Sequence, residues 1–464
     1  MGFFGRDTEL KSLNNMYQSD KFEMVIIYGR RRVGKTALIS EFIKDKRAIY
    51  YQARQVDRRD NLEGLTQAIN RFKGQTSNTG GFSDFDAVFQ EINELAQDEK
   101  LTFVIDEYPY LAESYAGVSS ILQANIDHLL IDNPNLTLVL LGSSMSFMAK
   151  QVLGYQSPIY GRKTGQIHLQ PFTIFEMQAI LSEVSNEELV AYFGILGGVP
   201  HYLNMIDQKA SIGENIERLF LQPAAPLLEE TLTLLKEELR DPEKYASILK
   251  AIAGGASKPS EIIQKSGIVA SSLGKYLENL IELGFVSKKL PVTEKPTSRK
   301  TLYQLDDQLF RFYYRFIDPE TSLIALGLTD NLADEMVNRL PTYLGHTFEI
   351  VIFQWFVKGL QTHELKFAPK QLGSWWGSDP ATKQQEELDF VAITRDNQTI
   401  TAESKFRDSG LNNGMIDKLV YRTNLIGLPN QQMYFFTKDM SAEMRGYAQS
   451  KQVEVVDLAT LLAK

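Results

Sequence analysis

The sequence contains no cysteine and only five histidines, which stand singly along the chain. The lack of cysteine excludes disulfide bonds, thiolate nucleophiles and cysteine-based zinc or iron–sulfur sites, and single histidines argue against a histidine-rich metal centre. The longest apolar run, around residues 136–142, is far shorter than the ~20 residues of a membrane-spanning helix. The first residues also lack the basic patch and apolar stretch of a signal peptide. We therefore expect a cytoplasmic protein with no membrane contact.

Composition places the chain among ordinary globular proteins. Its 464 residues, at roughly 150 per domain, predict about three domains. Hydrophobic residues make up 43% and charged residues 23%, which is too apolar for a disordered chain. The 49 lysines and arginines stand against 58 acidic residues, a net charge of −9. Because a net acidic surface does not attract nucleic acid by itself, any such contact has to come from local basic patches.

The first third of the chain alternates short β-rich runs with helix-length segments. Because strands separated by helices form parallel sheets, this pattern predicts an α/β fold with a doubly wound parallel sheet. The five expected strands are Glu23–Tyr28, Ala48–Ala53, Leu101–Ile105, Leu136–Leu141 and Gln166–Leu169.

The rest of the chain shows three further patterns of expected helices and strands. An almost wholly helical stretch, expected to form a lid, comes first. Three helices and a β-hairpin follow, which is the order of a winged helix. A long helix near residues 336–360 then leads into a final α/β segment. The expected domains span residues 1–170, 171–240, 241–318 and 319–464.

A phosphate-binding loop lies between the first expected strand and a helix. Gly29–Thr36 fits the pattern G-x-x-x-x-G-K-[ST] in the strand-to-helix context that this motif requires. Backbone amides and the helix N-terminus attract phosphates there. Lys35 reaches the β- and γ-phosphates, and the Thr36 hydroxyl is a Mg²⁺ ligand. The expected nucleotide contacts are Gly29, Arg30, Arg31, Arg32, Val33, Gly34, Lys35, Thr36 and Ala37.

Two carboxylates after the third expected strand complete this site. Asp106 is suited to hold Mg²⁺ through water, and Glu107 is suited to orient and deprotonate the attacking water. Ser143 and Ser144 follow the next strand, where Ser143 can contact the γ-phosphate or the water, unless both are ordinary turn serines. We therefore expect an ATP site with Mg²⁺, in which Lys35 and Glu107 are catalytic.

Several short motifs accompany the phosphate-binding loop. They are Phe4-Gly5-Arg6 with Glu9-Leu10, Ile105–Leu111, Leu141–Ser144, Pro158–Arg162 and Gly197–Leu203. Together these motifs resemble the archaeal-type ATPases, which belong to the STAND branch of AAA-type P-loop proteins and also occur in bacteria. The resemblance covers essentially the whole chain.

The resemblance implies roles for residues outside the loop. By analogy, Arg162 approaches the nucleotide or relays its state, although it could instead cap a helix or pair with an acid. Gly197–Pro200 would form the tight entry to the helical lid. No second sensor arginine is evident in the lid, so the hydrolysis rate and any need for an oligomer stay open.

The expected wing is basic, whereas the expected recognition helix, residues 271–282, carries one lysine against two glutamates. A basic wing can contact DNA phosphates. Alternatively, the winged helix packs against the nucleotide domain as a regulatory module, as in STAND-like ATPases. Both interpretations stay open. The basic residues of the wing are Lys288, Lys289, Lys295, Arg299 and Lys300, against the single acid Glu294.

A C-terminal hairpin carries a second group of charged residues. A β-run at 387–393 and a return strand at 399–405 flank a short turn. Strand alternation places Glu403 and Lys405 on one face, and antiparallel pairing brings Asp389 close to both. Two carboxylates bind Mg²⁺ or Mn²⁺, and a lysine positions the attacking water. This pattern is suited to phosphodiester cleavage, but it is also that of a charged hairpin with a cross-strand salt bridge.

The family resemblance extends to this hairpin. Archaeal-type ATPases often end in a domain of unknown function that resembles PD-(D/E)xK nucleases, with a restriction-endonuclease-like α/β fold. The resemblance implies that Glu349 is a further metal ligand beside Asp389 and Glu403. An aromatic pair, Trp375 and Trp376, precedes the hairpin and either packs under it or stacks on a base.

The sequence as a whole therefore predicts an ATP-binding, Mg²⁺-dependent NTPase. Its nucleotide state would control a DNA-binding or nuclease-like C-terminal module. The alternative is a regulatory protein in which ATP switches the binding of DNA or of a protein partner without cleavage.

Overall fold

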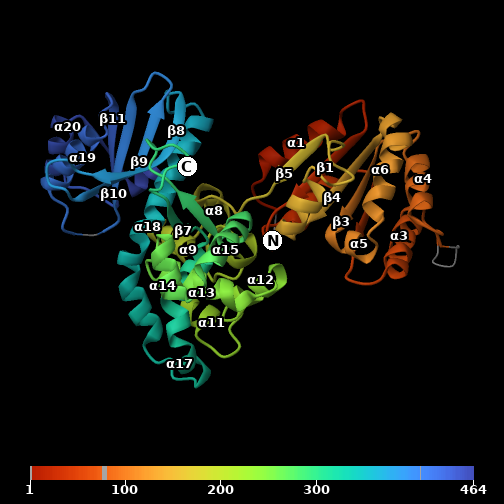
Figure 1. The fold of residues 1–464 in the computed structure, drawn as a ribbon, viewed down its shortest axis with the longest axis horizontal. Helices are drawn as coiled ribbons and strands as arrows, with labels where there is room; N and C mark the ends of the chain where they lie inside the picture. The colour runs from red at the N-terminus through yellow and green to blue at the C-terminus, as the bar shows by residue number, and fades with distance from the viewer. Residues whose placement is uncertain (1–2, 76–80, 408, 464) are drawn as a thin grey trace. The chain divides into compact units, whose positions relative to one another are not determined.

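The computed structural model describes residues 3–75, 81–407 and 409–463. Its ribbon is drawn in Figure 1, with the N-terminal part in red to yellow and the C-terminal part in green to blue. Within these ranges, every helix is too short or too polar to cross a lipid bilayer.

The chain forms two compact units: unit 1, residues 1–171 with 199–201, and unit 2, residues 172–198 with 202–464. Over its described residues, unit 1 is built on a five-stranded sheet in the order β2-β3-β4-β1-β5, and every neighbouring pair is parallel. The predicted parallel α/β sheet is thus confirmed. The strands are β1 (Glu23–Tyr28), β2 (Ala48–Gln52), β3 (Leu101–Asp106), β4 (Leu136–Gly142) and β5 (Gly165–His168).

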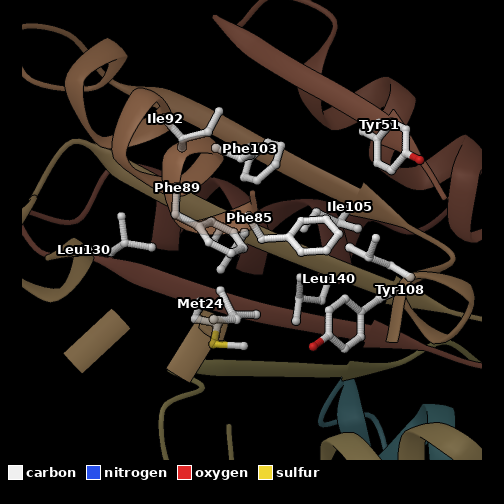
Figure 2. Close-up of a cluster of buried hydrophobic side chains, with 14 of the residues drawn as sticks. Met24, Tyr51, Phe85, Phe89, Ile92, Phe103, Ile105, Tyr108, Leu130 and Leu140 are labelled. Atoms are coloured by element: carbon white, nitrogen blue, oxygen red, sulfur yellow. The ribbon is translucent and has the colours of Figure 1, made fainter. Parts of the chain in front are cut away.

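Helices cover both faces of this sheet because neighbouring strand residues point in opposite directions. Met24 joins one apolar cluster, whereas the next residue, Val25, joins a second cluster on the other face. Figure 2 shows the first cluster, in which Phe85 and Phe89 of α4 pack with Phe103 of β3. The main helices are α1 (Asp7–Tyr17), α2 (Lys35–Ile43), α3 (Arg58–Phe72), α4 (Phe85–Leu95), α5 (Tyr108–Ser114), α6 (Val118–His128) and the short α7 (Met145–Phe147).

Unit 2 begins with the helical region that the sequence predicts, and side chains cap several of its helices. Thr173, Ser185 and Ser211 each accept a hydrogen bond from the backbone amide three residues later, and a glutamate there returns one. Such capping boxes satisfy amides that have no partner inside the helix, so they determine where these helices begin. The helices are α8 (Ile174–Ile180), α9 (Asn186–Leu196), α10 (Pro200–Leu203, which starts in unit 1), α11 (Ile212–Phe220) and α12 (Glu230–Glu238).

Helices and a short hairpin follow in the order expected for residues 241–318. Leu273, Leu277 and Leu280 are buried at the three-to-four spacing of a helix that packs on one side. The hairpin strands β6 and β7 are antiparallel, and we call the segment between them, residues 290–301, the wing loop. The elements are α13 (Pro242–Ala253), α14 (Pro259–Ser266), α15 (Ala270–Glu282), β6 (Val286–Lys289), β7 (Leu302–Leu305), α16 (Gln308–Phe312) and α17 (Thr321–Ala325).

The C-terminal part of unit 2 is a mixed sheet with helices on both faces. Its described strands follow the order β12-β11-β10-β9-β8, antiparallel from β8 to β10 and parallel from β10 to β12. Phe390 stacks on Phe356 of α18 with ring centroids 3.8 Å apart, whereas Val391 packs with Leu419 of α19 on the other face. The predicted return strand from β9 to β10 is confirmed. The elements are α18 (Leu332–Gln361), β8 (Pro369–Ser378), β9 (Gln385–Thr394), β10 (Thr399–Lys405), α19 (Asn413–Leu425), β11 (Asn430–Thr437), α20 (Ala442–Ser450), β12 (Val453–Asp457) and α21 (Leu458–Leu461).

Candidate functional site

The P-loop connects β1 to α2, and two of its glycines are required by geometry. A Cβ atom on Gly29 would lie 2.4 Å from the backbone oxygen of Leu169, far inside van der Waals contact. Gly34 has a φ of 94° at the N-cap of α2, a left-handed conformation that glycine adopts without strain. The loop therefore makes a compact turn that presents its backbone amides and a helix N-terminus to an anion.

Lys35 is buried in the first turn of α2. Its ammonium donates to the carbonyl oxygens of Gly29 at 2.8 Å and of Arg30 at 3.0 Å. Both acceptors belong to the loop, so the ammonium lies within reach of a phosphate that enters it. Charged phosphate oxygens are stronger acceptors than neutral carbonyls, and these contacts therefore fit the binding of a nucleotide.

The remaining P-loop residues have mainly structural contacts. Arg31 donates to the Tyr110 hydroxyl at 2.8 Å. The carbonyl of Val33 accepts a hydrogen bond of 3.1 Å from Arg6, whose guanidinium also donates to the carbonyl of Gln170 at 2.7 Å. Arg6 thus ties the N-terminal segment to the loop, a role that the sequence did not indicate. Of the other predicted contacts, Arg32 is left-handed with a φ of 69°, and Ala37 is exposed in the first turn of α2.

Asp106, the last residue of β3, accepts three hydrogen bonds. Its Oδ2 accepts from the hydroxyls of Thr36 at 2.9 Å and Tyr50 at 2.6 Å, and its Oδ1 accepts from the amide of Glu107 at 2.9 Å. Burial, followed by the hydrogen bond to Asp106, raises the pKa of Tyr50 above its usual range. Thr36 and Asp106 bring oxygen atoms together at one point, which fits the ligand preference of Mg²⁺. The sequence did not indicate Tyr50, which lies inside the apolar pattern of β2.

Glu107 and Ser143 meet at the carboxyl ends of two neighbouring strands. Oε2 of Glu107 accepts hydrogen bonds from the Ser143 hydroxyl at 2.8 Å and from its amide at 3.2 Å. Glu107 has a φ of 51°, a conformation that a residue other than glycine keeps only when its surroundings hold it there. The strand order β3-β4-β1 places both residues at the edge where the P-loop begins, the usual position of a ligand site in such sheets.

Arg162 takes a different position. Its Nε and Nη2 donate to the two carboxylate oxygens of Asp127, at 2.9 and 2.7 Å. The hydrogen bond from Arg162 lowers the pKa of Asp127. These contacts join Arg162 to α6, which is the pairing with an acid that the sequence left open, and they do not bring it together with the P-loop residues.

The glycine-rich segment after α9 leads back to the P-loop. Gly197 has a φ of 65°, and a Cβ atom on Gly198 would lie 1.7 Å from the backbone oxygen of Phe172, so both positions require glycine. The following three residues belong to unit 1. There Pro200 Cγ lies 3.8 Å from the Cβ position of Gly34, so this tight turn places a side chain against the phosphate-binding loop.

The β9–β10 hairpin gathers the predicted C-terminal residues around one cavity. Oδ2 of Asp389 accepts hydrogen bonds from the amide and the hydroxyl of Ser404, both at 2.7 Å. Lys405 donates to Oε1 of Glu403 at 2.7 Å. A cavity of about 660 Å³ is lined by Asp389, Glu403, Lys405 and Glu349. Alternation along β10 and pairing with β9 bring Asp389, Glu403 and Lys405 together, and α18 contributes Glu349.

Asp389 is only partly compensated in this cavity. Burial raises the pKa of Asp389 to about 8, and the negative charges of Glu403 and Glu349 add to the rise. Oε2 of Glu403 is buried and has no hydrogen-bond partner among the described residues. A divalent cation between Asp389 and Glu403 would supply that partner, so this oxygen-rich pair fits Mg²⁺ or Mn²⁺.

Glu349 is less clearly part of a metal site. Its Oε2 lies 2.9 Å from Nδ1 of His346, one turn earlier in α18. In the part of the chain that the structure describes, no three histidine, aspartate or glutamate side chains are arranged to hold one metal ion together. Mg²⁺ is often bound by only one or two carboxylates, with water and phosphate completing its shell, so a site of two protein ligands fits the arrangement.

Arg422 is a residue of this site that the sequence did not indicate. From α19 it donates to Oε2 of Glu386 at 2.7 Å and to Oε1 of Glu403 at 2.9 Å. All three side chains are nearly buried, with 11%, 10% and 6% exposed. Arg422 therefore balances two buried acids and orients Glu403. No sequence motif joins these three residues, which the fold brings together from β9, β10 and α19.

The wing loop packs against the C-terminal sheet. The amide of Val292 donates to the carbonyl of Ser374 in β8 at 2.9 Å, and the Val292 side chain is buried in a cluster with Trp375 and Leu388. This contact is made with the C-terminal sheet, so packing of the winged helix against the nucleotide domain stays a prediction. Trp375 packs in the core, as one of the two interpretations of the aromatic pair requires, and both tryptophans line a cavity of unit 2.

Two parts of the chain match known protein families. Residues 3–206 match a family described as an ATPase domain predominantly from Archaea, and residues 313–417 match a family of archaeal and bacterial proteins of unknown function. An uncharacterized ATP-binding protein of Methanocaldococcus jannaschii is 44% identical over 45 residues, which cover 10% of this chain and 76% of that protein.

Two further similarities span more of the chain. A Walker-type ATPase of Pyrococcus abyssi superposes with a TM-score of 0.50 at 21% identity, covering 68% of this chain and 96% of that one, and shows a shared fold. An uncharacterized protein of Methanocaldococcus jannaschii is 32% identical over 440 residues, which cover 93% of this chain and 94% of that protein. Because this alignment is nearly full-length, and because residues 3–206 match the archaeal ATPase domain, the chain belongs to this family of P-loop ATPases.

Proposed function

We propose that the protein is a Mg²⁺-dependent ATPase whose nucleotide state controls a nuclease-like C-terminal module. Lys35 binds the β- and γ-phosphates, and Glu107 accepts the proton of the attacking water at Oε1, because Ser143 holds its Oε2. Thr36 and Asp106 would hold Mg²⁺, which would supply positive charge beside the phosphates. The contact of 2.9 Å between Thr36 and Asp106 supports this assignment most directly, because it unites the P-loop and the end of β3 at one point.

Removal of the Lys35 ammonium tests the nucleotide assignment. We expect Lys35→Ala to abolish ATP retention, measured by equilibrium dialysis with radiolabelled ATP. Lys44→Ala is the matched control, because Lys44 lies at the other end of α2 and is 64% exposed. This control should bind ATP like the wild type. Normal ATP binding by Lys35→Ala would rule out the proposed site.

For the C-terminal module we propose hydrolysis of a phosphodiester bond. Asp389 and Glu403 would hold a divalent ion, which would supply Lewis-acid polarisation of the phosphodiester. Lys405 would position the attacking water and offset the developing negative charge, and Glu349, which lines the same cavity, would support the ion. The buried Oε2 of Glu403, without a partner among the described residues, is the observation that carries this proposal.

Cleavage assays test the C-terminal assignment. Plasmid and single-stranded DNA are incubated with Mg²⁺ or Mn²⁺, with and without ATP, and products are separated on gels. Cutting by the wild type should disappear in Asp389→Ala and Lys405→Ala but persist in Lys451→Ala, a control at a more exposed lysine of the same sheet domain. A dependence of cutting on ATP would show that the two sites are coupled. No cutting, or equal cutting by all four proteins, would eliminate the nuclease.

A regulatory protein that binds DNA or a protein partner without cutting it is the second candidate. The ion pairs of Glu403 favour it, because Oε1 already lies 2.7 Å from Lys405 and 2.9 Å from Arg422. A charged hairpin of this kind can be purely structural. Gel-shift assays with and without ATP separate the candidates: tight binding without cutting, unchanged in Asp389→Ala, supports the regulatory protein.

We further propose that the chain belongs to the STAND branch of AAA-type P-loop proteins and is divided into four domains. Bound nucleotide acts as a switch, because phosphates stabilise the arrangement with which they make more contacts. The docked wing loop supports a winged helix that transmits this state within the molecule. We assign residues 1–170 to the ATPase domain, 171–240 to a helical lid, 241–318 to a winged helix and 319–464 to a restriction-endonuclease-like domain.

A further inference from the structure

Adjoining cavities extend from the wing loop to the nuclease-like site of unit 2. One cavity, of about 390 Å³, is lined by residues of β7, β8 and β9, among others. It shares Glu349 and Asp389 with the cavity of the nuclease-like site. It also shares Trp376 and Glu387 with a third cavity, which reaches the wing loop. The three cavities therefore adjoin one another through shared lining residues and form a path from the wing loop to Asp389.

Aromatic side chains line the middle of this path. Trp376 pairs with Glu387 in the β8–β9 ladder and lines the same cavity as Asp389. Its neighbour Trp375 is buried in the core. Tyr303 of β7 lines the same cavity as Trp376 and is half-buried. Aromatic rings therefore line the same cavity as the carboxylates of Glu349 and Asp389.

Cationic side chains line the end of the path at the wing loop. The third cavity is lined by Lys258 of the α13–α14 connection, by Arg299 and Lys300 of the wing loop, and by Arg422. Lys300 also pairs with Glu294 at 2.7 Å, and Arg422 balances the buried acids. Proteins that bind a single nucleic-acid strand commonly combine exposed lysines and arginines with aromatic side chains on which the bases stack.

We propose that the 390 Å³ cavity binds one unpaired nucleotide of a single-stranded nucleic acid. The base stacks on Trp376, and the neighbouring phosphates contact Lys258, Arg299 and Lys300, which delivers the next phosphodiester to Asp389. This inference rests on the proposed cleavage activity and gives it a substrate class. Cavities of this volume enclose a ligand the size of one nucleotide.

Binding in EDTA tests the inference without cleavage. Fluorescence anisotropy is measured with labelled 20-residue DNA and RNA, each as a single strand and as a duplex. We expect single strands to bind more tightly than duplexes, and the tighter of the two sugars identifies the natural substrate. Trp376→Ala should weaken single-strand binding roughly 5- to 150-fold, the range for one lost stacking contact, while Trp376→Phe keeps most of it. Equal or tighter binding of duplex, or wild-type binding by a folded Trp376→Ala, would overturn the inference.

A second variant tests the binding of single strands if Trp376→Ala does not fold. Arg299→Ala with Lys300→Ala changes only exposed wing-loop side chains. The slope of log affinity against log salt should become shallower by about 1.4, because each phosphate contact to a single strand contributes about 0.7. An unchanged slope would overturn the inference. Selective single-strand binding by a wild type that cuts nothing with Mg²⁺ or Mn²⁺ would support the nucleotide pocket and refute only the proposed cleavage.

Discussion

The phenolic oxygen of Tyr50 lies 2.6 Å from Oδ2 of Asp106. The two residues belong to neighbouring parallel strands, β2 and β3, and the same carboxylate oxygen accepts the Thr36 hydroxyl at 2.9 Å. Tyr50 therefore orients the carboxylate at the site proposed for Mg²⁺. A side chain from the middle of a hydrophobic strand pattern thus helps to shape the nucleotide site.

Replacement of Tyr50 by phenylalanine should weaken the binding of Mg²⁺ at Asp106, because the carboxylate loses a hydrogen bond that orients it. A hydrogen bond to a charged group is worth roughly 1.5–3 kcal/mol, so we expect Tyr50→Phe to need at least about tenfold more Mg²⁺ for half-maximal ATP hydrolysis. Retention of ATP in EDTA should not change. Tyr51→Phe is the matched control, because its hydroxyl bonds to Asn61 at 2.6 Å instead. Identical Mg²⁺ titrations of both variants and the wild type would contradict the role of Tyr50.

Ser143 should affect the rate of hydrolysis more than the binding of ATP. Ser143→Ala removes one of two hydrogen bonds to Oε2 of Glu107. A hydrogen bond to a charged group is worth roughly 1.5–3 kcal/mol, so kcat should fall at least about tenfold while KM for ATP stays the same. Steady-state phosphate release measures both constants. The neighbouring Ser144→Ala should behave like the wild type, because its side chain does not cap α7, and a normal kcat in Ser143→Ala would refute the contact's role.

Two glycines should respond to alanine in opposite ways. Gly29→Ala forces a Cβ atom to within 2.4 Å of a backbone oxygen, and such overpacking costs about 1–3 kcal/mol. Gly446 lies inside α20, where a Cβ atom would meet nothing within 4 Å. Gly446→Ala should therefore stabilise the protein by about 0.5–1 kcal/mol, because alanine loses less backbone entropy on folding. Calorimetric melting temperatures should move down for the first variant and up for the second, and a rise for Gly29→Ala would show that the loop is not so close-packed.

Arg422 should be important for the stability of unit 2. Arg422→Leu leaves Glu386 and Glu403 buried without their shared partner, and an uncompensated buried charge costs about 3–5 kcal/mol. Lys418→Ala is the control, because Lys418 is 53% exposed and lies 3.5 Å from Glu386, so its loss should cost less than about 1 kcal/mol. Denaturant unfolding compares the two. Partial recovery in the double variant Arg422→Leu with Glu386→Gln would confirm that charge is the cause, whereas equal stability of both single variants would contradict it.

Much of the fold follows from local patterns in the sequence. Short, nearly continuous runs of apolar residues predict the five described strands of unit 1 to within two residues, because a strand buried on both faces is apolar along most of its length. The P-loop is also local, since eight consecutive residues contain the glycines, the lysine and the threonine. The β9–β10 hairpin likewise needs only one short turn to bring Asp389 beside Glu403 and Lys405.

Other features depend on residues that are far apart in the chain. Tyr50 reaches Asp106 because β2 and β3 pair, and Arg422 reaches Glu403 because α19 packs on the sheet that contains β10. Arg162 bonds to Asp127, and the wing loop packs on β8. The sequence by itself determined the secondary structure and the local motifs, because these follow from steric and hydrophobic periodicity over a few residues. Only the tertiary structure decided which partners orient the acids and cover the wing loop, because those contacts arise from long-range packing that no local pattern records.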